Sequence, residues 1–533
     1  MATSPTLDSI SEVEALLPHD IQDSDNTQPP LARNRASGRW IANPYWVIPV
    51  VLVANISRGM TVSPRIQVFN EIACRVLSAS SPGDISPTML LPDTCQTPEV
   101  QARASRIQAS IVITMSVLSS ASTGLWSQWG DIKGRKLLFI VSIVGFIAME
   151  LVFILVSAPS INQRGELFIL IGPVFEGLCG GYSVFNAVFH AYISDCTPDG
   201  SRSKIFSSVQ GIVFVGRALG PWIAGIVLSN STLGSHSLFY ISVSIQLVLL
   251  VYVLFFVPES LRSRERQRPE VDVELEPRPT TMRAIEDKQS IKQIIRRFMV
   301  VFVSPITMFR PRVVEDGVSR RKDYSLTLLG SAMFLYIVST AVYQLKFLYG
   351  QHTYDWTTVQ LGYYMSFLWI SRAINLLILL PILISYLKPK TPIVVLSAPE
   401  AIAREIQFDK CLARASLTVD AMGDLLIVAT PASSQVAFIG ASCLSAFTSG
   451  GNPALHSLGA VCLHALGHSS ETGRLFGAVG VLDAIAHIMA PAFFAAIYGM
   501  TVGSYPKTIF VFAATFLLSS VLLLGGIRRK GVQ

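Results

Sequence analysis

Long apolar runs with few charged residues recur along the chain from about residue 40 onward. A helix of roughly 20 such residues crosses the hydrocarbon core of a bilayer, which is about 30 Å thick. No series of short alternating strands is visible, and backbone amides in lipid must be paired within their own segment. The pattern therefore predicts an all-α membrane protein. About twelve transmembrane helices are expected, near Tyr45–Pro64, Ile107–Trp129, Leu137–Ala158, Leu167–Tyr192, Ile205–Leu228, Leu238–Val257, Ser325–Tyr349, Leu361–Leu387, Leu412–Thr430, Val436–Cys462, Leu475–Gly499 and Ile509–Ile527.

The composition agrees with a surface that faces lipid. Of 533 residues, 51% are hydrophobic and 14% are charged, and the mean hydropathy is +0.49. A soluble chain of ordinary size needs more polar surface than this. Residues 1–39, in contrast, are polar and lack the apolar core of a signal peptide, so a disordered cytoplasmic tail is expected there.

Basic residues mark one side of the membrane. By the positive-inside rule, both termini are predicted to be cytoplasmic, and we favour the plasma membrane over the vacuolar membrane. Asn230 begins an Asn-Ser-Thr pattern on the opposite side and is a candidate glycosylation site. The basic residues after the second, fourth, sixth and last spans are Lys133, Arg135, Lys136, Arg202, Lys204, several within 262–322, and those of 528–530.

Two cysteines share the long loop after the first span. Cys74 and Cys95 would lie on the oxidising side of the membrane, so we predict that they form a disulfide; two free surface thiols are the alternative. The remaining cysteines show no CxxC spacing. No metal site and no cofactor are expected.

The chain contains an internal repeat at a shift of 270 residues, which is 450 minus 180. Parallel repeats of this kind place two six-helix bundles around an axis along the membrane normal, with a substrate site between them. The bundles are expected at 40–258 and 325–527, joined by a flexible cytoplasmic linker at 259–324 with an amphipathic piece at 291–301, and followed by a tail at 528–533. The shift aligns Gly180 with Gly450, Gly181 with Gly451, Asn186 with His456, Lys204 with Arg474, Gly220 with Ala490, Pro221 with Pro491 and Gly225 with Ala495.

The segment 130–136, Gly-Asp-Ile-Lys-Gly-Arg-Lys, resembles the signature loop of the major facilitator superfamily. Residues 216–225 are similar to the GxxxGP motif in the fifth helix of proton-driven exporters of that family, where small residues allow close packing and proline bends the helix. The resemblance implies a gating role for Asp131, Gly134, Arg135 and Lys136, with Asp195, Arg202 and Arg474 as gate contacts, and a packing role for Gly216, Gly220, Pro221, Gly225 and Pro491.

A narrower resemblance extends over nearly the whole chain after Gly38. It is similar to a fungal branch of the superfamily related to tetracycline exporters, hippocampus abundant transcript proteins and proton-coupled folate transporters. This resemblance implies the major facilitator fold and small-molecule transport, but it does not name the cargo. The similar segments are 98–101, 191–195, 258–260, 412–416 and 473–476.

Ionisable side chains within the predicted spans are candidate functional residues, because a charge at the centre of a membrane helix costs about 2.5–3.5 kcal/mol. Asp483 and His487 are one turn apart on the eleventh span and share a face. We predict that Asp483 exchanges a proton during transport, with His487 as its relay or partner. Further candidates for proton coupling or for the substrate cavity are Arg58, Glu176, Arg217, Arg372, His456 and Asn186.

The same charges also have a purely structural interpretation. Intramembrane ion pairs often only lock helices together, and Glu176 with Arg217 is the candidate pair between adjacent helices. Asp420 and Asp424 share a face of the ninth span, which is peripheral in the resembled fold. Local hydrogen bonding or snorkelling is therefore expected for these two carboxylates.

No enzyme signature competes with transport: phosphate loops, zinc-binding HExxH and nucleophile elbows are missing from the sequence. We expect a proton-coupled secondary transporter that exports a small organic solute. It would be a monomer in the lipid bilayer with no nucleic-acid partner. A proton-coupled importer, an energy-independent uniporter and a non-transporting receptor with the same fold remain alternatives.

The predicted disulfide has a simple test. Reduction of the intact protein is expected to change its electrophoretic mobility, because breaking the bond between Cys74 and Cys95 opens the loop that it closes. The change should vanish in Cys74→Ser. A wild-type protein whose mobility is indifferent to reductant would instead contain two free thiols.

Overall fold

The computed structural model describes residues 42–79, 95, 97–157, 165–196, 202–230, 232, 234–260, 304–316, 319–387, 398–446, 450–466 and 472–527. The chain separates into residues 1–41, which lie outside this set, and one unit of residues 42–533. The expected N-terminal tail, the amphipathic piece at 291–301 and the last basic residues therefore lie outside the described part of the chain.

The first bundle contains six spans, several of which are interrupted helices. A short 3₁₀ turn, η2, leads into the first span. The elements are η2 (Pro44–Trp46), α1 (Val47–Met60), α2 (Val62–Ala79), α3 (Pro98–Lys133), α4 (Arg135–Ser157), α5 (Gly165–Phe168), α6 (Ile171–Leu178), α7 (Gly181–Cys196), α8 (Arg202–Ser229) and α9 (Ser237–Phe255).

The second bundle repeats this plan after a 3₁₀ turn and a two-stranded sheet. A π-helical segment, η6, interrupts its second span. The elements are η5 (Ser304–Phe309), β1 (Arg312–Asp316), β2 (Ser319–Asp323), α12 (Ser325–Thr340), α13 (Val342–Tyr354), α14 (Thr358–Ile374), η6 (Asn375–Leu379), α15 (Leu380–Leu387), α16 (Ala398–Ala429), α17 (Gln435–Ala446), α18 (Gly451–Ala465), α19 (Thr472–Thr501) and α20 (Thr508–Gly525).

Each predicted span corresponds to a helix or to consecutive helices. Among the described residues, ten helical stretches are long and apolar enough to cross a membrane. Helix α16 and the pair α17–α18 occupy the other two predicted positions. The prediction of an all-α membrane fold with about twelve spans is therefore confirmed.

The hydropathy pattern predicted where the spans lie more accurately than it predicted the residues at which their helices begin, end or break. Helix α3 begins at Pro98 rather than near Ile107 because the hydroxyl of Thr97 accepts a hydrogen bond from the amide of Val100 and caps the helix. The fourth predicted span is broken, because Gly180 and Gly181 adopt positive φ angles of 88° and 58°. Apolar residues continue through this break, so periodicity alone could not reveal it.

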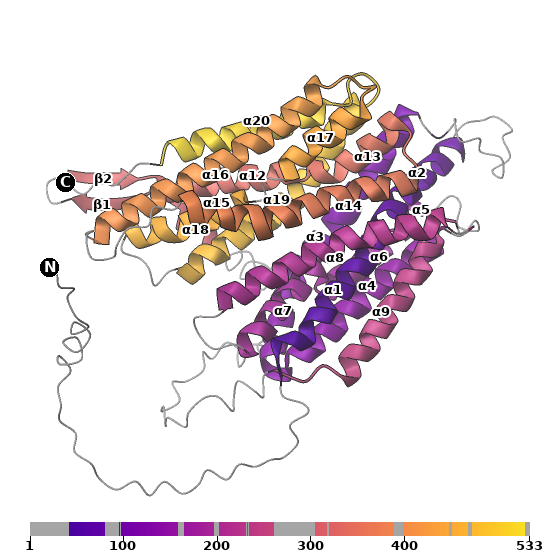
Figure 1. Ribbon diagram of the computed structural model, residues 1–533, viewed down its shortest axis with the longest axis horizontal. Helices are drawn as coiled ribbons and strands as arrows, with labels where there is room; N and C mark the ends of the chain where they lie inside the picture. Colours follow the sequence, from indigo (N-terminus) through magenta and orange to yellow (C-terminus); the bar gives the residue numbers. More distant parts are fainter. Residues whose placement is uncertain are drawn as a thin grey trace, which may run out of the picture. The chain divides into compact units, whose positions relative to one another are not determined.

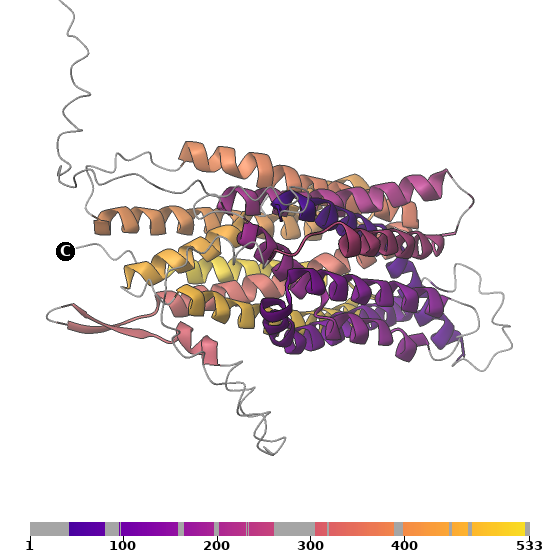
Figure 2. The same ribbon diagram turned by 90° about the horizontal axis from the view of Figure 1, so that it is seen from below.

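The linker prediction was wrong in one respect. Within 259–324, strands β1 and β2 form an antiparallel pair in which Arg312 faces Asp323. The strands are rich in charged residues and lack the apolar alternation that predicts a half-buried strand. Figure 2 shows this hairpin projecting from the end of the unit at which α12 begins.

The two ends of the unit differ, and we name them for their features. The hairpin end carries β1, β2 and the turn between α3 and α4; the disulfide end carries the last turns of α2 and α13. Helices α8 and α14 pack together, as do α3 and α19, so each pair joins one bundle to the other. In Figure 1 the ribbons of α2 and α13 lie near each other at the disulfide end, whereas α7 and α18 are well separated.

Small residues bring α1 and α8 into close contact. A Cβ atom on Gly220 would lie 2.5 Å from the carbonyl oxygen of Ile56 and 2.7 Å from the Cα of Gly59. In lipid, helix association depends on such close packing, because the surrounding tails are as apolar as the side chains. The α1–α8 interface thus has no room for a larger residue at Gly220.

We expect Gly220→Ala to lower the thermal unfolding temperature of the purified protein by a few degrees, because overpacking costs about 1–3 kcal/mol. Gly124→Ala on α3 is the matched control, since a Cβ there would meet nothing within 4 Å. Melting curves in detergent measure the difference. Equal melting temperatures for the two variants would contradict the tight interface.

Candidate functional site

A cavity of about 460 Å³ lies in the second bundle between α12, α18 and α19. It brings together three of the predicted candidates, Asp483, His487 and His456. A pocket of this size suits a small ligand or part of one. Its lining residues are Tyr336, Ile337, Thr340, Asn452, His456, Val479, Gly480, Asp483 and His487.

Asp483 and His487 form an exposed acid–base pair on the cavity wall. Their side chains are 53% and 50% exposed, and Nδ1 of His487 lies 3.4 Å from Oδ1 of Asp483. The same Nδ1 lies 2.9 Å from the backbone carbonyl oxygen of Asp483, which makes Nδ1 the protonated nitrogen. Nε2 is then the nitrogen that can take up a further proton, and Asp483 is placed to stabilise the resulting cation.

Of two other predicted cavity residues, one lines this cavity and one does not. His456 shares the cavity and places Nδ1 2.9 Å from the carbonyl oxygen of Asn452. Asn186, its repeat partner, is half-buried on α7 in the other bundle and does not line the cavity.

The predicted pairing of Glu176 with Arg217 was wrong. Glu176 is fully buried, and its Oε1 accepts a hydrogen bond of 2.7 Å from Nη1 of Arg58. The guanidinium of Arg58 also lies 4.2 Å from the ring centroid of Phe146. Arg58 lies on α1 and Glu176 on α6, and periodicity along one helix does not record which helix lies opposite it.

Arg217 lies where the two bundles meet. Its Nε donates a weak hydrogen bond of 3.4 Å to Oδ1 of Asn55. Its guanidinium carbon lies 4.8 Å from the ring of Tyr182 on α7 and 5.2 Å from the ring of Trp369 on α14. Aromatic rings of both bundles therefore flank this one cation.

Arg372 also lies near the indole of Trp369. Its guanidinium carbon is 5.4 Å from the ring of Trp369 and 4.1 Å from the ring of Tyr343. Asp420, which is buried on α16, interacts electrostatically with Arg372. Of the two expectations for Asp420, local hydrogen bonding or snorkelling, snorkelling is wrong, because its side chain is enclosed by the bundle.

Sequence reasoning missed a buried ion pair in the second bundle. Nζ of Lys346 lies 2.8 Å from Oδ1 of Asp424, and these side chains are 1% and 4% exposed. Local hydrogen bonding or snorkelling was expected for Asp424, yet its carboxylate pairs with a buried cation from another helix. Lys346 interrupts an apolar run near the end of the seventh predicted span. A charge at such a position could have indicated from the sequence that an ion pair is buried there.

A second missed pair lies in the first bundle. Nη2 of Arg65 lies 2.6 Å from Oε1 of Glu150, whose side chain is 1% exposed. The hydroxyl of Thr61 donates a hydrogen bond of 2.9 Å to the same oxygen. Glu150 sits in the predicted third span, so its charge within an apolar run could have indicated the pair.

The predicted gate residues gather at the hairpin end. Nε of Arg135 lies 3.3 Å from Oδ2 of Asp195, and the hydroxyl of Ser260 donates a hydrogen bond of 3.1 Å to that oxygen. This contact ties the start of α4 to the end of α7 within the first bundle. The side chains of Asp131 and Arg202 lie outside the described part of the structure, and Arg474 is exposed.

Glu259 completes this network and was not predicted as a site residue. Its carboxylate accepts hydrogen bonds from the backbone amides of Arg135 and Lys136, at 2.7 and 3.1 Å, and so caps α4. Gly134 has a φ of 107°, and a Cβ there would lie 2.3 Å from Oε2 of Glu259. The glycine is therefore required both by its backbone angle and by the carboxylate beside it.

The packing residues named from the motif meet neighbouring helices. A Cβ on Gly216 would lie 2.8 Å from Cβ of Asn55, and a Cβ on Gly225 would lie 2.8 Å from Cε1 of Tyr363. Pro221 and Pro491 lie inside α8 and α19. Helix α8 thus packs closely against α1 within its bundle and against α14 across the interface.

Polar side chains join the bundles at the disulfide end. Nδ2 of Asn70 donates a hydrogen bond of 2.9 Å to Oε1 of Gln351, and the hydroxyl of Thr358 donates one of 2.7 Å to Oε1 of Gln67. A second cavity, of about 690 Å³, lies beside these contacts and is lined by both bundles. Nearby, the hydrogen bond with Glu71 raises the pKa of His236, so low pH favours this contact.

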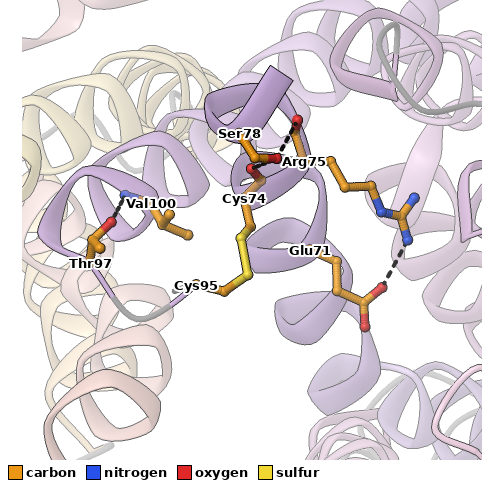
Figure 3. Close-up of a disulfide and its surroundings, with 7 residues drawn as sticks. All are labelled: Glu71, Cys74, Arg75, Ser78, Cys95, Thr97 and Val100. Carbon is orange, nitrogen blue, oxygen red and sulfur yellow. Dashed lines mark hydrogen bonds and ion pairs between the residues drawn. A yellow bond between two sulfur atoms is a disulfide. The ribbon is translucent and has the colours of Figure 1, made fainter. Parts of the chain in front are cut away.

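A disulfide closes the loop at this end. Cys74 of α2 and Cys95, just before α3, are bonded, with their Cα atoms 5.3 Å apart (Figure 3). Figure 3 also shows the ion pair of Glu71 with Arg75, whose Oε2 and Nη2 are 3.4 Å apart. Asn230, the candidate glycosylation site, is exposed after α8, whereas Ser231 of its pattern lies outside the described residues.

Residues 40–399 match the model of the Major Facilitator Superfamily. The chain is 22% identical over 485 residues to MFS-type transporter avaJ of Aspergillus versicolor, covering 90% of this chain and 88% of that protein. It is 24% identical over 215 residues to MFS efflux pump atnC of Emericella nidulans, covering 40% and 41%. In fold it resembles the inward open conformation of the xylose transporter XylE from E. coli, with a TM-score of 0.54 and 12% identity over 92% of this chain and 98% of that one. The family match, together with the two bundles of membrane-spanning helices, shows that this multi-pass integral membrane protein is a transporter of the major facilitator superfamily.

Proposed function

We propose that the protein is a proton-coupled exporter of a small organic solute that works by alternating access. The observation that carries the proposal is the exposed pair of Asp483 and His487 on the wall of a 460 Å³ cavity. An ionisable pair within a membrane bundle marks an ion or substrate pathway by default. Most other carboxylates in the core are already engaged, as Glu176, Glu150 and Asp424 are with basic residues.

Coupling requires a group that gains and loses a proton as the cavity opens in turn to the two sides of the membrane. Nε2 of His487 is available for this, and the carboxylate of Asp483 stabilises the protonated form. The driving force is sufficient, because one charge that crosses 100 mV is worth about 2.3 kcal/mol. Binding of the solute and protonation of His487 would then exclude each other during the transport cycle.

The placement of contacts supports alternating access. Hydrogen bonds across the bundles, such as Asn70 to Gln351, lie at the disulfide end. Asp483 lies nearer the start of α19, which is at the hairpin end. We assign the hairpin end to the cytoplasm, because the basic residues concentrate there, and we place the protein in the plasma membrane as a monomer.

Export is the direction we favour. Among the relatives, one is named an efflux pump and another is an MFS-type transporter from a filamentous fungus. The GxxxGP-like segment of α8, with Gly220 and Pro221 packed against α1, agrees with this direction.

The coupling role is tested by metabolite partitioning between cells and medium. A strain that carries Asp483→Asn is expected to retain the same compound as a deletion strain, because an uncharged amide cannot stabilise protonated His487 as the carboxylate does. The restored wild-type strain should release it. Glu99→Gln is the matched control, since it makes the same carboxylate-to-amide change at an exposed position of α3.

Other outcomes separate the alternatives. Depletion of the compound inside the deletion strain would identify an importer. Export that persists in Asp483→Asn and ignores the pH gradient would identify a uniporter. If no compound differs in its partitioning between cells and medium among the strains, the protein does not transport, and a receptor function gains support.

We assign a structural role to the pair of Arg58 and Glu176. Arg58→Gln is expected to destabilise the protein by about 3–5 kcal/mol, because it leaves a fully buried carboxylate without its cation. Arg217→Gln should cost much less, since Glu176 keeps its partner. Thermal unfolding of the purified variants compares them, and a second substitution, Glu176→Gln, should partly rescue Arg58→Gln. Equal losses for Arg58→Gln and Arg217→Gln would count against the assignment.

A further inference from the structure

Arg217 is a cation in the core whose hydrogen-bonding capacity is largely unused. A guanidinium carries five N–H donors in a planar fork. Nε of Arg217 reaches Asn55 at 3.4 Å, and the terminal nitrogens have no acceptor among the described residues. Asn55 cannot neutralise the cation, because its amide is uncharged and its Nδ2 already donates to the carbonyl oxygen of Val51.

Four other basic residues of the membrane helices interact with acidic residues. Arg58 pairs with Glu176, Arg65 with Glu150 and Lys346 with Asp424, while Arg372 interacts electrostatically with Asp420. In the described parts of both bundles, no carboxylate lies within salt-bridge distance of Arg217. A charge in this medium needs compensation, so the missing anion has to come from outside the described chain.

Aromatic rings surround this cation from both bundles. Tyr182 of the first bundle and Trp369 of the second lie 4.8 and 5.2 Å from the guanidinium carbon. Trp369 also stacks on Phe214, with ring centroids 5.9 Å apart and planes inclined by 25°. Arg372 lies 5.4 Å from the same indole. A planar ring would find stacking partners here, and an acidic group would find two cations.

We propose that the solute is an organic anion that carries an aromatic ring. The terminal N–H groups of Arg217 bind its carboxylate, or a comparable oxyanion, through two parallel hydrogen bonds. Tyr182 and Trp369 pack against its ring. This inference rests on the proposed transport function and adds the substrate class to it.

The position of the site suits a step in alternating access. Arg217 belongs to α8 and Trp369 to α14, the helices that join one bundle to the other. An anion held between them contacts both bundles at once and favours their approach. A membrane potential that is negative inside the cell also favours outward movement of an anion.

Binding to two matched dyes tests the inference. Fluorescein is an aromatic carboxylate, whereas rhodamine 123 carries a positive charge on the same ring system. With the protein in lipid nanodiscs and empty nanodiscs as the blank, fluorescence anisotropy should show saturable binding of fluorescein and weaker binding of rhodamine 123. Arg217→Gln should weaken fluorescein binding on the order of tenfold or more, since hydrogen bonds to charged groups are lost.

Two further variants serve as controls. Arg217→Lys keeps the positive charge but lacks the planar N–H donors of a guanidinium. The affinity of this variant for fluorescein should therefore lie between those of wild type and Arg217→Gln. Arg106→Gln removes an exposed arginine of α3 whose side chain, within the described part of the chain, bonds only to the carbonyl oxygen of Ala102. This variant should bind fluorescein as wild type does. The inference is overturned if wild type shows no saturable fluorescein binding, if Arg217→Gln binds it equally well, or if rhodamine 123 binds more tightly.

Flux measurements distinguish failure of this inference from failure of the proposed function. In proteoliposomes with a pH gradient, fluorescein should be carried by wild type but lose its response to the gradient in Asp483→Asn. Arg217-dependent binding without any flux would leave the anion site in place and refute transport. Flux of rhodamine 123 that is indifferent to Arg217 would support transport and refute the anionic substrate class.

Discussion

The pairing of charges in a medium without water is the constraint on which the rest of this structure depends. Glu176 is fully buried, and Nη1 of Arg58 donates a hydrogen bond of 2.7 Å to its carboxylate. Lys346 with Asp424 and Arg65 with Glu150 follow the same rule in their own bundles. Such pairs contribute little net stability over apolar packing, but losing one partner is costly, so they hold helices in one arrangement.

Close packing of small residues decides where the unpaired groups lie. Because Gly59 and Gly220 let α1 and α8 approach, α8 also comes close to α14, and Arg217 meets Trp369 across the interface. Asp483 and His487 stay exposed in a separate cavity of the second bundle. The core therefore contains ion pairs that join helices as well as side chains that stay exposed or lack a carboxylate partner among the described residues.

At the hairpin end, the short turn between α3 and α4 makes contacts with several other elements of the first bundle. Glu259 caps α4 through two backbone amides, while Asp195 holds the side chain of Arg135. Gly134 makes this possible, since its positive φ and missing Cβ leave room for the carboxylate. The loop therefore connects α3, α4, α7 and the segment after α9. Because these contacts share residues, a change in one of them alters the surroundings of the others.

The sequence by itself determined the spans and the face shared by Asp483 and His487, because both follow from distances along one helix: the length needed to cross lipid and the spacing of one turn. It also indicated that charges such as Glu176 and Arg217 must be compensated by a partner or serve a function, because a charge within the membrane is costly. Only the tertiary structure decided the partners, since Glu176 meets a cation that lies 118 residues away on another helix. Pairing across helices depends on packing geometry that no local pattern records, and this is why Lys346 and Asp424 could not be matched from the sequence.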